Sequence, residues 1–291
     1  MKKSYFFAFL TIIIWSTMPT ISKLLLGQLD SYTLLSLSTL LAGVIMFIVN
    51  ICFKKWSIIK SYSIKDYAKM AAISLPGVFF YYAFYYAGAA ILSASQAFII
   101  NYLWPVMSII FACLILKEKM TVRKIVAVAL SFLGVFTVAG NDLISFNAQS
   151  IKGMLLCFLA AVSYGLYTAL NKKSSFDKQV SITVSMFVTG LLSLIIAFVR
   201  DENIFIQPAQ LLGLLWNGLF TMAVANLLWM LALQAGNTAK ISNLAYITPF
   251  LSLVWTFLIL REPIKPLSII GLCIIVVGIF IQLKDTKKAV T

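Results

Sequence analysis

Long apolar runs recur along this sequence from its first residues almost to its last. A helix needs about 20 predominantly apolar residues to cross the hydrocarbon core of a bilayer. Ten runs of roughly that length lie near residues 5–26, 32–53, 67–87, 90–116, 122–139, 152–171, 180–199, 211–233, 239–260 and 266–283. The sequence therefore predicts an all-α integral membrane protein with ten transmembrane helices.

The composition supports this prediction. Of the 291 residues, 62% are hydrophobic and only 11% are charged, and the mean hydropathy is +0.99. Soluble domains average about 45–50% apolar and about 25% charged residues. So few charges cannot cover a water-soluble fold, and the alternating segments of about 10 residues that mark a transmembrane barrel are absent. Lipid is therefore expected to form much of the solvent.

The net charge of +14 follows the predicted topology. With the N-terminus inside and ten alternating spans, 18 of the 23 basic residues face the inner side and five face the outer side. The acidic residues divide four to five, so the bias belongs to the basic residues, as the positive-inside rule expects. We therefore expect both termini to be cytoplasmic, the lipid bilayer to be the partner of the charged surface, and no nucleic acid to bind.

A repeated segment indicates a duplication. LILKEK at 114–119 returns as LILREP at 258–263, which is 144 residues later. The same offset aligns further pairs, namely Tyr102 with Tyr246, Pro105 with Pro249, Ser108 with Ser252, Glu118 with Glu262 and Gly134 with Gly278. Self-similarity over this length is typical of a duplicated half-protein rather than a solenoid period.

Each predicted half contains five spans, and this odd number makes the second half enter the membrane from the opposite side. The result is an inverted repeat, which is typical of transporters with alternating access and a binding site near the bilayer midplane. The predicted divisions are a first repeat at 1–140, an outer linker at 141–151, a second repeat at 152–284 and a cytoplasmic tail at 285–291.

Two prolines occupy equivalent places in the fourth and ninth spans. Pro105 and Pro249 remove the hydrogen bonds to the carbonyls of Asn101 and Ala245. In a bilayer, a freed carbonyl must find a partner in protein or in cavity water. This pattern indicates a hinge or gate near the binding region, and an ordinary transmembrane proline is the alternative.

Two glutamates end the repeated segments. Glu118 and Glu262 fall at span ends, where charged groups reach the headgroup region. We favour anchoring at the interface for both, with a gate or a contact between the repeats as the alternative.

The third span carries FFYYAFYYAGAA at residues 79–90. Tyr81 and Tyr85, like Tyr82 and Tyr86, are four residues apart and form two adjacent stripes on a helix. An interfacial tyrosine belt is one interpretation. Four hydroxyls near the middle of a span would each need a partner in lipid, so a wet cavity is the interpretation we favour.

Four segments carry a resemblance to a known family. They are IIIWST (12–17), INYLWPVMSIIFA (100–112), SYGLYTALNKK (163–173) and LAYITPFLSLVW (244–255). With them, nearly the whole chain resembles the drug/metabolite transporter superfamily, EamA type, and it is nearest the aromatic amino-acid exporter branch. The resemblance implies ten helices packed as a basket around a central cavity that is lined by spans 1, 3, 4, 6, 8 and 9.

The resemblance also implies which residues line the cavity. Tyr102 and Trp104 lie about 200° apart on an ideal helix, so both can face a cavity only if the helix unwinds near Pro105. The resemblance assigns Tyr81, Tyr82, Tyr85, Tyr102, Trp104 and Tyr164 to the cavity, and Trp15 and Trp229 could join them in an aromatic box. Asn101 and Asn226 could donate to a substrate carboxylate, with hydrogen bonding between helices as the alternative. These ten are the predicted substrate-binding residues. Their rings could stack on a flat ring or hold a quaternary ammonium at about 0.5–2 kcal/mol per contact.

The sequence lacks the residues that several kinds of chemistry require. The predicted spans have no Asp or Glu deep inside, and the chain has no histidine, so proton coupling through a buried group is not expected. No Walker motif, nucleophile triad or metal-ligand cluster is present, and the four cysteines fall in or beside spans. We expect no cofactor, no metal and no enzymatic activity.

The sequence predicts a secondary transporter of the bacterial inner membrane that moves a small metabolite by facilitated or exchange transport. Export of amino acids, aromatic ones foremost, is the leading hypothesis. Transport of a choline-like quaternary amine or another small cationic metabolite is the alternative. A membrane enzyme or an open channel is disfavoured, and a monomer is the working hypothesis.

Overall fold

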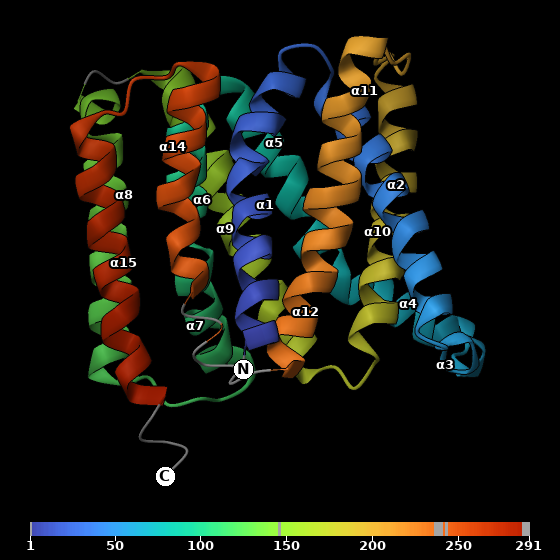
Figure 1. The fold of residues 1–291 in the computed structure, drawn as a ribbon. Helices are drawn as coiled ribbons and strands as arrows, with labels where there is room; N and C mark the ends of the chain where they lie inside the picture. Colours follow the sequence, from blue (N-terminus) through green and yellow to red (C-terminus); the bar gives the residue numbers. More distant parts are fainter. Residues whose placement is uncertain (1, 145–146, 236–240, 242–243, 287–291) are drawn as a thin grey trace. The chain divides into compact units, whose positions relative to one another are not determined.

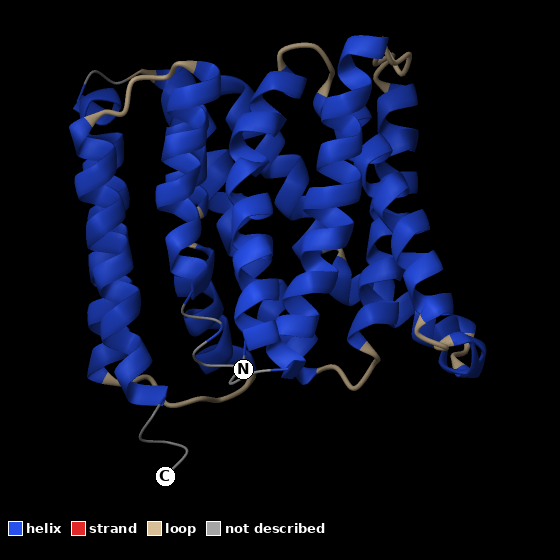
Figure 2. Cartoon of the chain, viewed as in Figure 1, coloured by secondary structure: helices blue, strands red, loops and turns tan. Residues whose placement is uncertain are grey.

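The computed structural model describes residues 2–144, 147–235, 241 and 244–286. Within these ranges every regular element is a helix, and no strand is present (Figure 2). The predicted all-α fold is therefore confirmed for the described part of the chain.

Eight helices of the described part are long and apolar enough to cross a membrane. They are Lys3–Leu26, Ser31–Cys52, Ile64–Ile91, Ala94–Ile115, Val122–Gly140, Ala148–Lys173, Lys178–Val199 and Pro208–Ala235. Two shorter apolar helices follow, Ala245–Leu260 and Pro266–Ile281. The predicted ninth span begins among residues that lie outside the described ranges, so the count of ten spans stays a prediction.

The chain divides into two compact units. Unit 1 consists of Met1–Phe79 and Ser175–Arg261, and unit 2 consists of Phe80–Ser174 and Glu262–Thr291. Each unit combines a segment from each predicted half of the sequence. The predicted boundary at 141–151 concerns the duplication of the sequence, and it stays a prediction.

Unit 1 is built around two helix packings. Its elements are α1 (Lys2–Leu26), α2 (Ser31–Cys52), α3 (Trp56–Ser61), α4 (Ile64–Ser74), α10 (Lys178–Val199), α11 (Pro208–Leu215), η2 (Trp216–Val224), α12 (Ala225–Ala235), η3 (Ala245–Ile247) and α14 (Thr248–Leu260). α2 lies against α10, and α1 packs on α12 and α14 (Figure 1). The buried face of α2 includes Ser36, Thr39 and Ala42, and such small residues let membrane helices approach closely.

Unit 2 places α9 against two other elements. Its helices are α5 (Tyr81–Ile91), α6 (Ala94–Asn101), α7 (Trp104–Ile115), α8 (Val122–Ile144), α9 (Ala148–Lys173) and α15 (Pro266–Thr286). α9 packs on α5 and on α7, while α8 and α15 run alongside each other (Figure 1). The segment η1 (Pro76–Phe80) runs from the last residues of Met1–Phe79 in unit 1 to the first residue of unit 2, precedes α5 and has π-helical geometry.

Irregular turns recur at a constant sequence spacing. The helices Ile64–Ile91 and Pro208–Ala235 begin 144 residues apart and end 144 residues apart. Each contains a π-helical stretch, which ends at Phe80 in η1 and at Val224 in η2, again 144 residues apart. Helix starts repeat at the same spacing, with Trp104 and Thr248 opening α7 and α14 and Val122 and Pro266 opening α8 and α15. π-Helical turns are rare and often mark functional sites.

Candidate functional site

The fourth span is broken in its middle. α6 ends at Asn101, α7 begins at Trp104, and Tyr102 and Leu103 form the turn between them. Pro105 lies in the first turn of α7, where its missing N–H is tolerated. It also leaves the Asn101 carbonyl without the N–H that a regular helix would supply. The helix is therefore interrupted at Tyr102 and Leu103, and whether Tyr102 and Trp104 both face a cavity stays a prediction.

Pro249 has the corresponding place in unit 1. It lies in the first turn of α14, directly after the short 3₁₀ helix η3. Both prolines therefore start a helix after an irregular turn. Their role as hinges or gates stays a prediction.

The broken turn brings two predicted site residues together. The Tyr102 and Trp104 ring centroids are 6.4 Å apart and edge-on, at an interplanar angle of 74°. Trp104 in turn meets Tyr164 of α9, with ring centroids 5.1 Å apart at 80°. Tyr102 is buried, whereas Trp104 and Tyr164 are partly exposed. Edge-to-face pairs of this kind are favourable for aromatic side chains.

The tyrosines of α5 continue this array of rings. Tyr81 lies 5.0 Å from Tyr164, measured between ring centroids, and it stacks on Tyr85 at 6.2 Å and 9°. Tyr82 meets Tyr81 edge-on at 4.8 Å, and its ring is tilted by 49° to that of Tyr86. We call Tyr81, Tyr82, Tyr85, Tyr102, Trp104 and Tyr164 the aromatic cluster. All six belong to unit 2.

Asn101 links the broken turn to the aromatic cluster. Its Nδ2 donates a hydrogen bond of 3.0 Å to the Tyr81 hydroxyl. The side chain is buried, with 1% of the residue exposed, and its Oδ1 has no hydrogen-bond partner among the described residues. Asn101 therefore offers an unused acceptor beside the rings.

Two glycines let the helices that carry these rings approach each other. A Cβ at Gly165, next to Tyr164, would lie 2.7 Å from the backbone carbonyl carbon of Met107 on α7. A Cβ at Gly88 of α5 would lie 2.6 Å from Cys157 Sγ on α9. Both distances are too short for any larger residue without a shift. Glycine at these positions therefore permits the ring contacts between α5, α7 and α9.

Three predicted site residues lie in unit 1. Trp15 of α1 and Trp229 of α12 have ring centroids 5.3 Å apart at 51°, and both are partly exposed. Asn226 Nδ2 donates 2.7 Å to the Met222 carbonyl in the preceding turn. One of its N–H groups is therefore used locally.

The WST segment meets a tryptophan at each of its three positions. Beside the Trp15 and Trp229 contact, the Trp255 Nε1–H of α14 donates 2.9 Å to Ser16 Oγ. The Trp216 Nε1–H of η2 donates 2.8 Å to Thr17 Oγ1. Neither Trp216 nor Trp255 is among the predicted site residues, because no local pattern in the sequence connects them to α1. We call Trp15, Trp216, Trp229 and Trp255 the tryptophan cluster.

The structure also adds two tyrosines to the neighbourhood of the aromatic cluster. Tyr86 approaches Tyr85 at 6.0 Å, and Tyr167 approaches Tyr164 at 5.8 Å. Tyr86 lies in the tyrosine-rich segment 79–90 and Tyr167 in the segment 163–173, so their spacing is a signal that the sequence contains. The predicted residues thus fall into two groups, seven in unit 2 and three in unit 1.

Glu262 caps a helix. Its Oε1 accepts 2.9 Å from the Ala94 backbone N–H, and its Oε2 accepts from the N–H and hydroxyl of Ser95 at 3.3 and 3.2 Å. These N–H groups open α6, where a helix has unsatisfied donors and a favourable field for a carboxylate.

Glu118 makes ion pairs instead. Its carboxylate meets Lys172 Nζ at 3.0 Å and Lys124 Nζ at 3.1 Å. Hydrogen bonds from Lys172 and then Lys124 hold the pKa of Glu118 below its ordinary value. Glu118 thereby joins the start of α8 to the end of α9.

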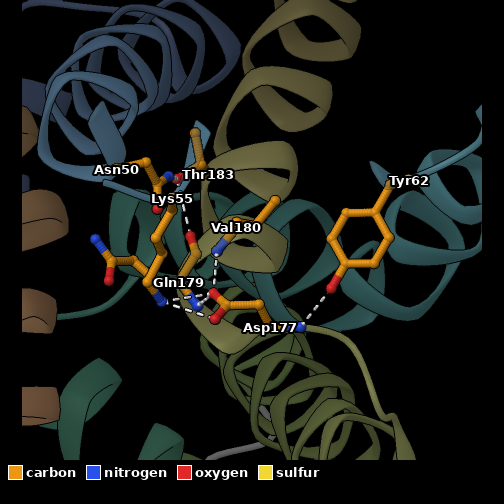
Figure 3. Close-up of polar contacts among 7 residues, drawn as sticks. All are labelled: Asn50, Lys55, Tyr62, Asp177, Gln179, Val180 and Thr183. Atoms are coloured by element: carbon orange, nitrogen blue, oxygen red, sulfur yellow. Dashed lines mark hydrogen bonds and ion pairs between the residues drawn. The ribbon is translucent and has the colours of Figure 1, made fainter. Parts of the chain in front are cut away.

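A polar cluster joins the two ends of α3 to the start of α10 (Figure 3). Lys55 Nζ contacts both carboxylate oxygens of Asp177, at 2.7 and 2.8 Å. The same carboxylate accepts 3.0 Å hydrogen bonds from the Gln179 and Val180 backbone N–H groups, and the Asp177 N–H donates to the Tyr62 hydroxyl. Burial raises the pKa of Asp177, but the bonds from Lys55 and the helix N–H groups outweigh it, so the net pKa is lowered. This cluster fixes the start of α10.

The apolar helices and the comparisons with known proteins define a multi-pass membrane protein of the transporter class. The model of the EamA-like transporter family matches residues 2–140 and 151–283, so the chain belongs to that family.

Individual relatives differ in how much they are characterised. An uncharacterized transporter from Clostridium kluyveri is 28% identical over 99% of this chain and 96% of its own length. The aromatic amino acid exporter YddG of Salmonella typhimurium is 25% identical over 59% of this chain and 61% of its own length. A solved crystal structure with 17% identity matches with a TM-score of 0.69 and covers all of both chains, which shows a shared fold.

Proposed function

We propose that this protein is an alternating-access secondary transporter that exports amino acids, aromatic ones foremost, by facilitated or exchange transport. Membership of a transporter family supports the class, and the partial likeness to an aromatic amino acid exporter supports the substrate.

The observation that carries the proposal is the chain of ring contacts from Tyr81 through Tyr164 to Trp104 beside the broken turn. Rings supply flat apolar faces for an aromatic substrate. A broken helix supplies backbone groups that can bind polar atoms at membrane depth. An aromatic amino acid combines these two requirements in one small molecule.

The constant spacing of helix bounds supports two inverted five-helix repeats. Two matched segments of the family model, 2–140 and 151–283, are what a duplication would produce. In an inverted repeat, discontinuous helices at corresponding places form the binding region. Pro105 and Pro249 would then act as hinges for the two access states.

The location and partners follow from the same proposal. The basic residues favour a bacterial inner membrane with both termini in the cytoplasm. The partners are a small-molecule substrate and the lipid bilayer, and a monomer is sufficient. Trp15, Asn226 and Trp229 remain predicted substrate contacts.

A second candidate function is transport of a choline-like quaternary amine or another small cation. The ring faces of the aromatic cluster favour it, since tyrosine and tryptophan faces attract cations at about 0.5–2 kcal/mol per contact. A choline-like substrate has no carboxylate, so the site would need no hydrogen-bond donors for one.

Counterflow in proteoliposomes tests the proposal. Vesicles loaded with unlabelled tryptophan should accumulate labelled tryptophan from outside, and phenylalanine and tyrosine should block that accumulation. Block by choline alone would replace the first candidate with the second. Absence of exchange with either compound would contradict both. Acidification of the lumen driven by substrate would contradict transport without proton coupling.

A further inference from the structure

Asn101 has an acceptor that the protein does not use. Its Nδ2 is engaged by the Tyr81 hydroxyl at 3.0 Å, whereas Oδ1 has no partner among the described residues although the side chain is 1% exposed. Buried polar atoms in folded proteins are nearly always hydrogen-bonded, because an unpaired atom loses its hydrogen bonds to water and gains none in the protein. A donor from outside the chain, such as water or a substrate group, can therefore pair with this oxygen.

A second acceptor belongs to the same residue. The Asn101 carbonyl would receive the N–H of residue 105 in a continuous helix, but that residue is proline. The side-chain oxygen and the backbone carbonyl therefore both leave acceptor capacity at the last residue of α6.

The surroundings of these acceptors suit a positive donor. The rings of Tyr81, Tyr164 and Trp104 present negative faces that attract a cation. The lone pairs of Asn101 Oδ1 and of the Asn101 carbonyl oxygen would repel a carboxylate. A quaternary ammonium has no N–H and could not form a hydrogen bond with either oxygen. A primary ammonium has three N–H donors and a positive charge, so it meets both requirements.

We propose that Asn101 recognises a primary ammonium group of the substrate, with its Oδ1 and its backbone carbonyl as the two acceptors. The inference rests on the proposed function for its setting and goes further in naming the chemical group that is read. It assigns Asn101 to the amino end of an amino acid rather than to its carboxylate. It also excludes the quaternary amine as the preferred ligand.

Two matched probes test the proposal on the purified full chain in lipid nanodiscs. Tryptamine has an indole and a primary ammonium, and N,N,N-trimethyltryptammonium has the same ring and charge without an N–H. Direct binding of each is measured at equilibrium. A hydrogen bond to a charged group predicts that tryptamine binds at least about tenfold more tightly. Equal affinities, or no binding of tryptamine, would overturn the proposal.

Variants assign the preference to Asn101. Asn101→Leu keeps the approximate shape and removes the acceptor, so the two probes should bind with nearly equal affinity. Asn50→Leu is the matched control, because Asn50 is also a fully buried membrane asparagine with an unpartnered Oδ1 and lies in unit 1. It should retain the preference for tryptamine. If Asn50→Leu abolishes the preference as completely as Asn101→Leu, the assignment is wrong.

Asn101→Asp tests the orientation of the amide. A carboxylate keeps the acceptors, so this variant should preserve or increase the preference for tryptamine. Loss of the preference in Asn101→Asp would show that the unused group is an N–H, which overturns the proposal.

Probe binding and tryptophan counterflow test ammonium recognition and transport separately. A clear preference for tryptamine without tryptophan counterflow would remove the proposed function and leave ammonium recognition standing. Tryptophan counterflow with equal binding of the two probes would support transport and overturn the role of Asn101.

Discussion

The Trp255 indole N–H donates a 2.9 Å hydrogen bond to the Ser16 hydroxyl, joining two residues that are 239 positions apart in the sequence. The Ser16 hydroxyl itself donates a hydrogen bond of 2.7 Å to the Ile13 carbonyl within α1. Ser16 is fully buried, so its hydroxyl is the acceptor that satisfies the indole. This bond fixes the end of an indole from α14 against α1.

Ser16→Ala should therefore destabilise the protein. The change leaves the Trp255 N–H without its acceptor. Hydrogen bonds between membrane helices average about 0.6 kcal/mol, and an unpaired donor adds to that cost, so we expect the free energy of unfolding to fall by about 1 kcal/mol. Thermal unfolding of the purified protein measures it. In the double variant Ser16→Ala with Trp255→Phe, the second change should add less than it does alone. Strictly additive losses would contradict the coupling.

Trp104→Ala should weaken substrate binding far more than it weakens folding. Trp104 packs against the buried residues Leu103, Met107 and Ala161 but stays partly exposed and meets Tyr164 edge-on. Its truncation therefore removes a stacking face beside the broken turn together with only part of this packing. We expect a loss of tryptophan affinity of up to about tenfold, because aromatic pairs contribute about 0.5–1.5 kcal/mol beyond the area they bury. Equilibrium binding and thermal unfolding provide the two readouts.

Trp56→Ala is the matched control for that prediction. Trp56 lies in the short helix α3 and is 47% exposed, so its removal should leave tryptophan affinity unchanged. Retention of full affinity in Trp104→Ala would show that Trp104 does not contact the substrate.

Gly165→Ala should disturb both stability and binding. A Cβ there would lie 2.7 Å from the Met107 backbone carbonyl carbon, so α9 must move away from α7 and take Tyr164 away from Trp104. Such overpacking typically costs about 1–3 kcal/mol. Gly140→Ala is the control, since its nearest neighbouring atom would be Leu267 Cδ1 at 3.7 Å, an ordinary contact. Equal unfolding temperatures for the two variants would contradict the close approach of α9 and α7.

These cases show which features a sequence can reveal. Tyr81 and Tyr85 are four residues apart on one helix, so their stacking follows from helical geometry alone. The break before α7 follows from Pro105, because a ring without an N–H cannot continue the helical ladder. The eight long helices also follow from a local feature, because each contains an apolar run long enough to cross a bilayer.

Other features depend on packing between distant segments. The contact of Ser16 with Trp255 and that of Thr17 with Trp216 have no local signal, because indoles are common in membrane helices for many reasons. The part played by Gly165 depends on the approach of α7, more than 50 residues earlier in the sequence. The tilt of Tyr82 against Tyr86 depends likewise on neighbouring rings rather than on helical spacing.

Asp177→Asn should lower stability at neutral pH and have little effect in acid. Asparagine can still cap α10, so the change mainly removes the charge that faces Lys55 at 2.7 Å. The pKa of Asp177 is lowered in the folded protein, so its charge adds stability at a pH above the unfolded value of about 3.9. That stability is lost as the pH falls through the folded pKa. For a half-buried pair we expect about 1 kcal/mol at pH 7.

Thermal unfolding of the wild type and Asp177→Asn between pH 3 and pH 7 measures this dependence. The difference between their unfolding temperatures should be largest near pH 7 and should shrink below about pH 4. When Asp177→Asn is introduced into a protein that already carries Lys55→Met, it should change the unfolding temperature at pH 7 much less than it does in the wild type. The reason is that Lys55→Met deletes the charge that the carboxylate faces. A difference that stays constant across this pH range would show that Asp177 stabilises α10 through hydrogen bonding to the Gln179 and Val180 N–H groups rather than through its charge.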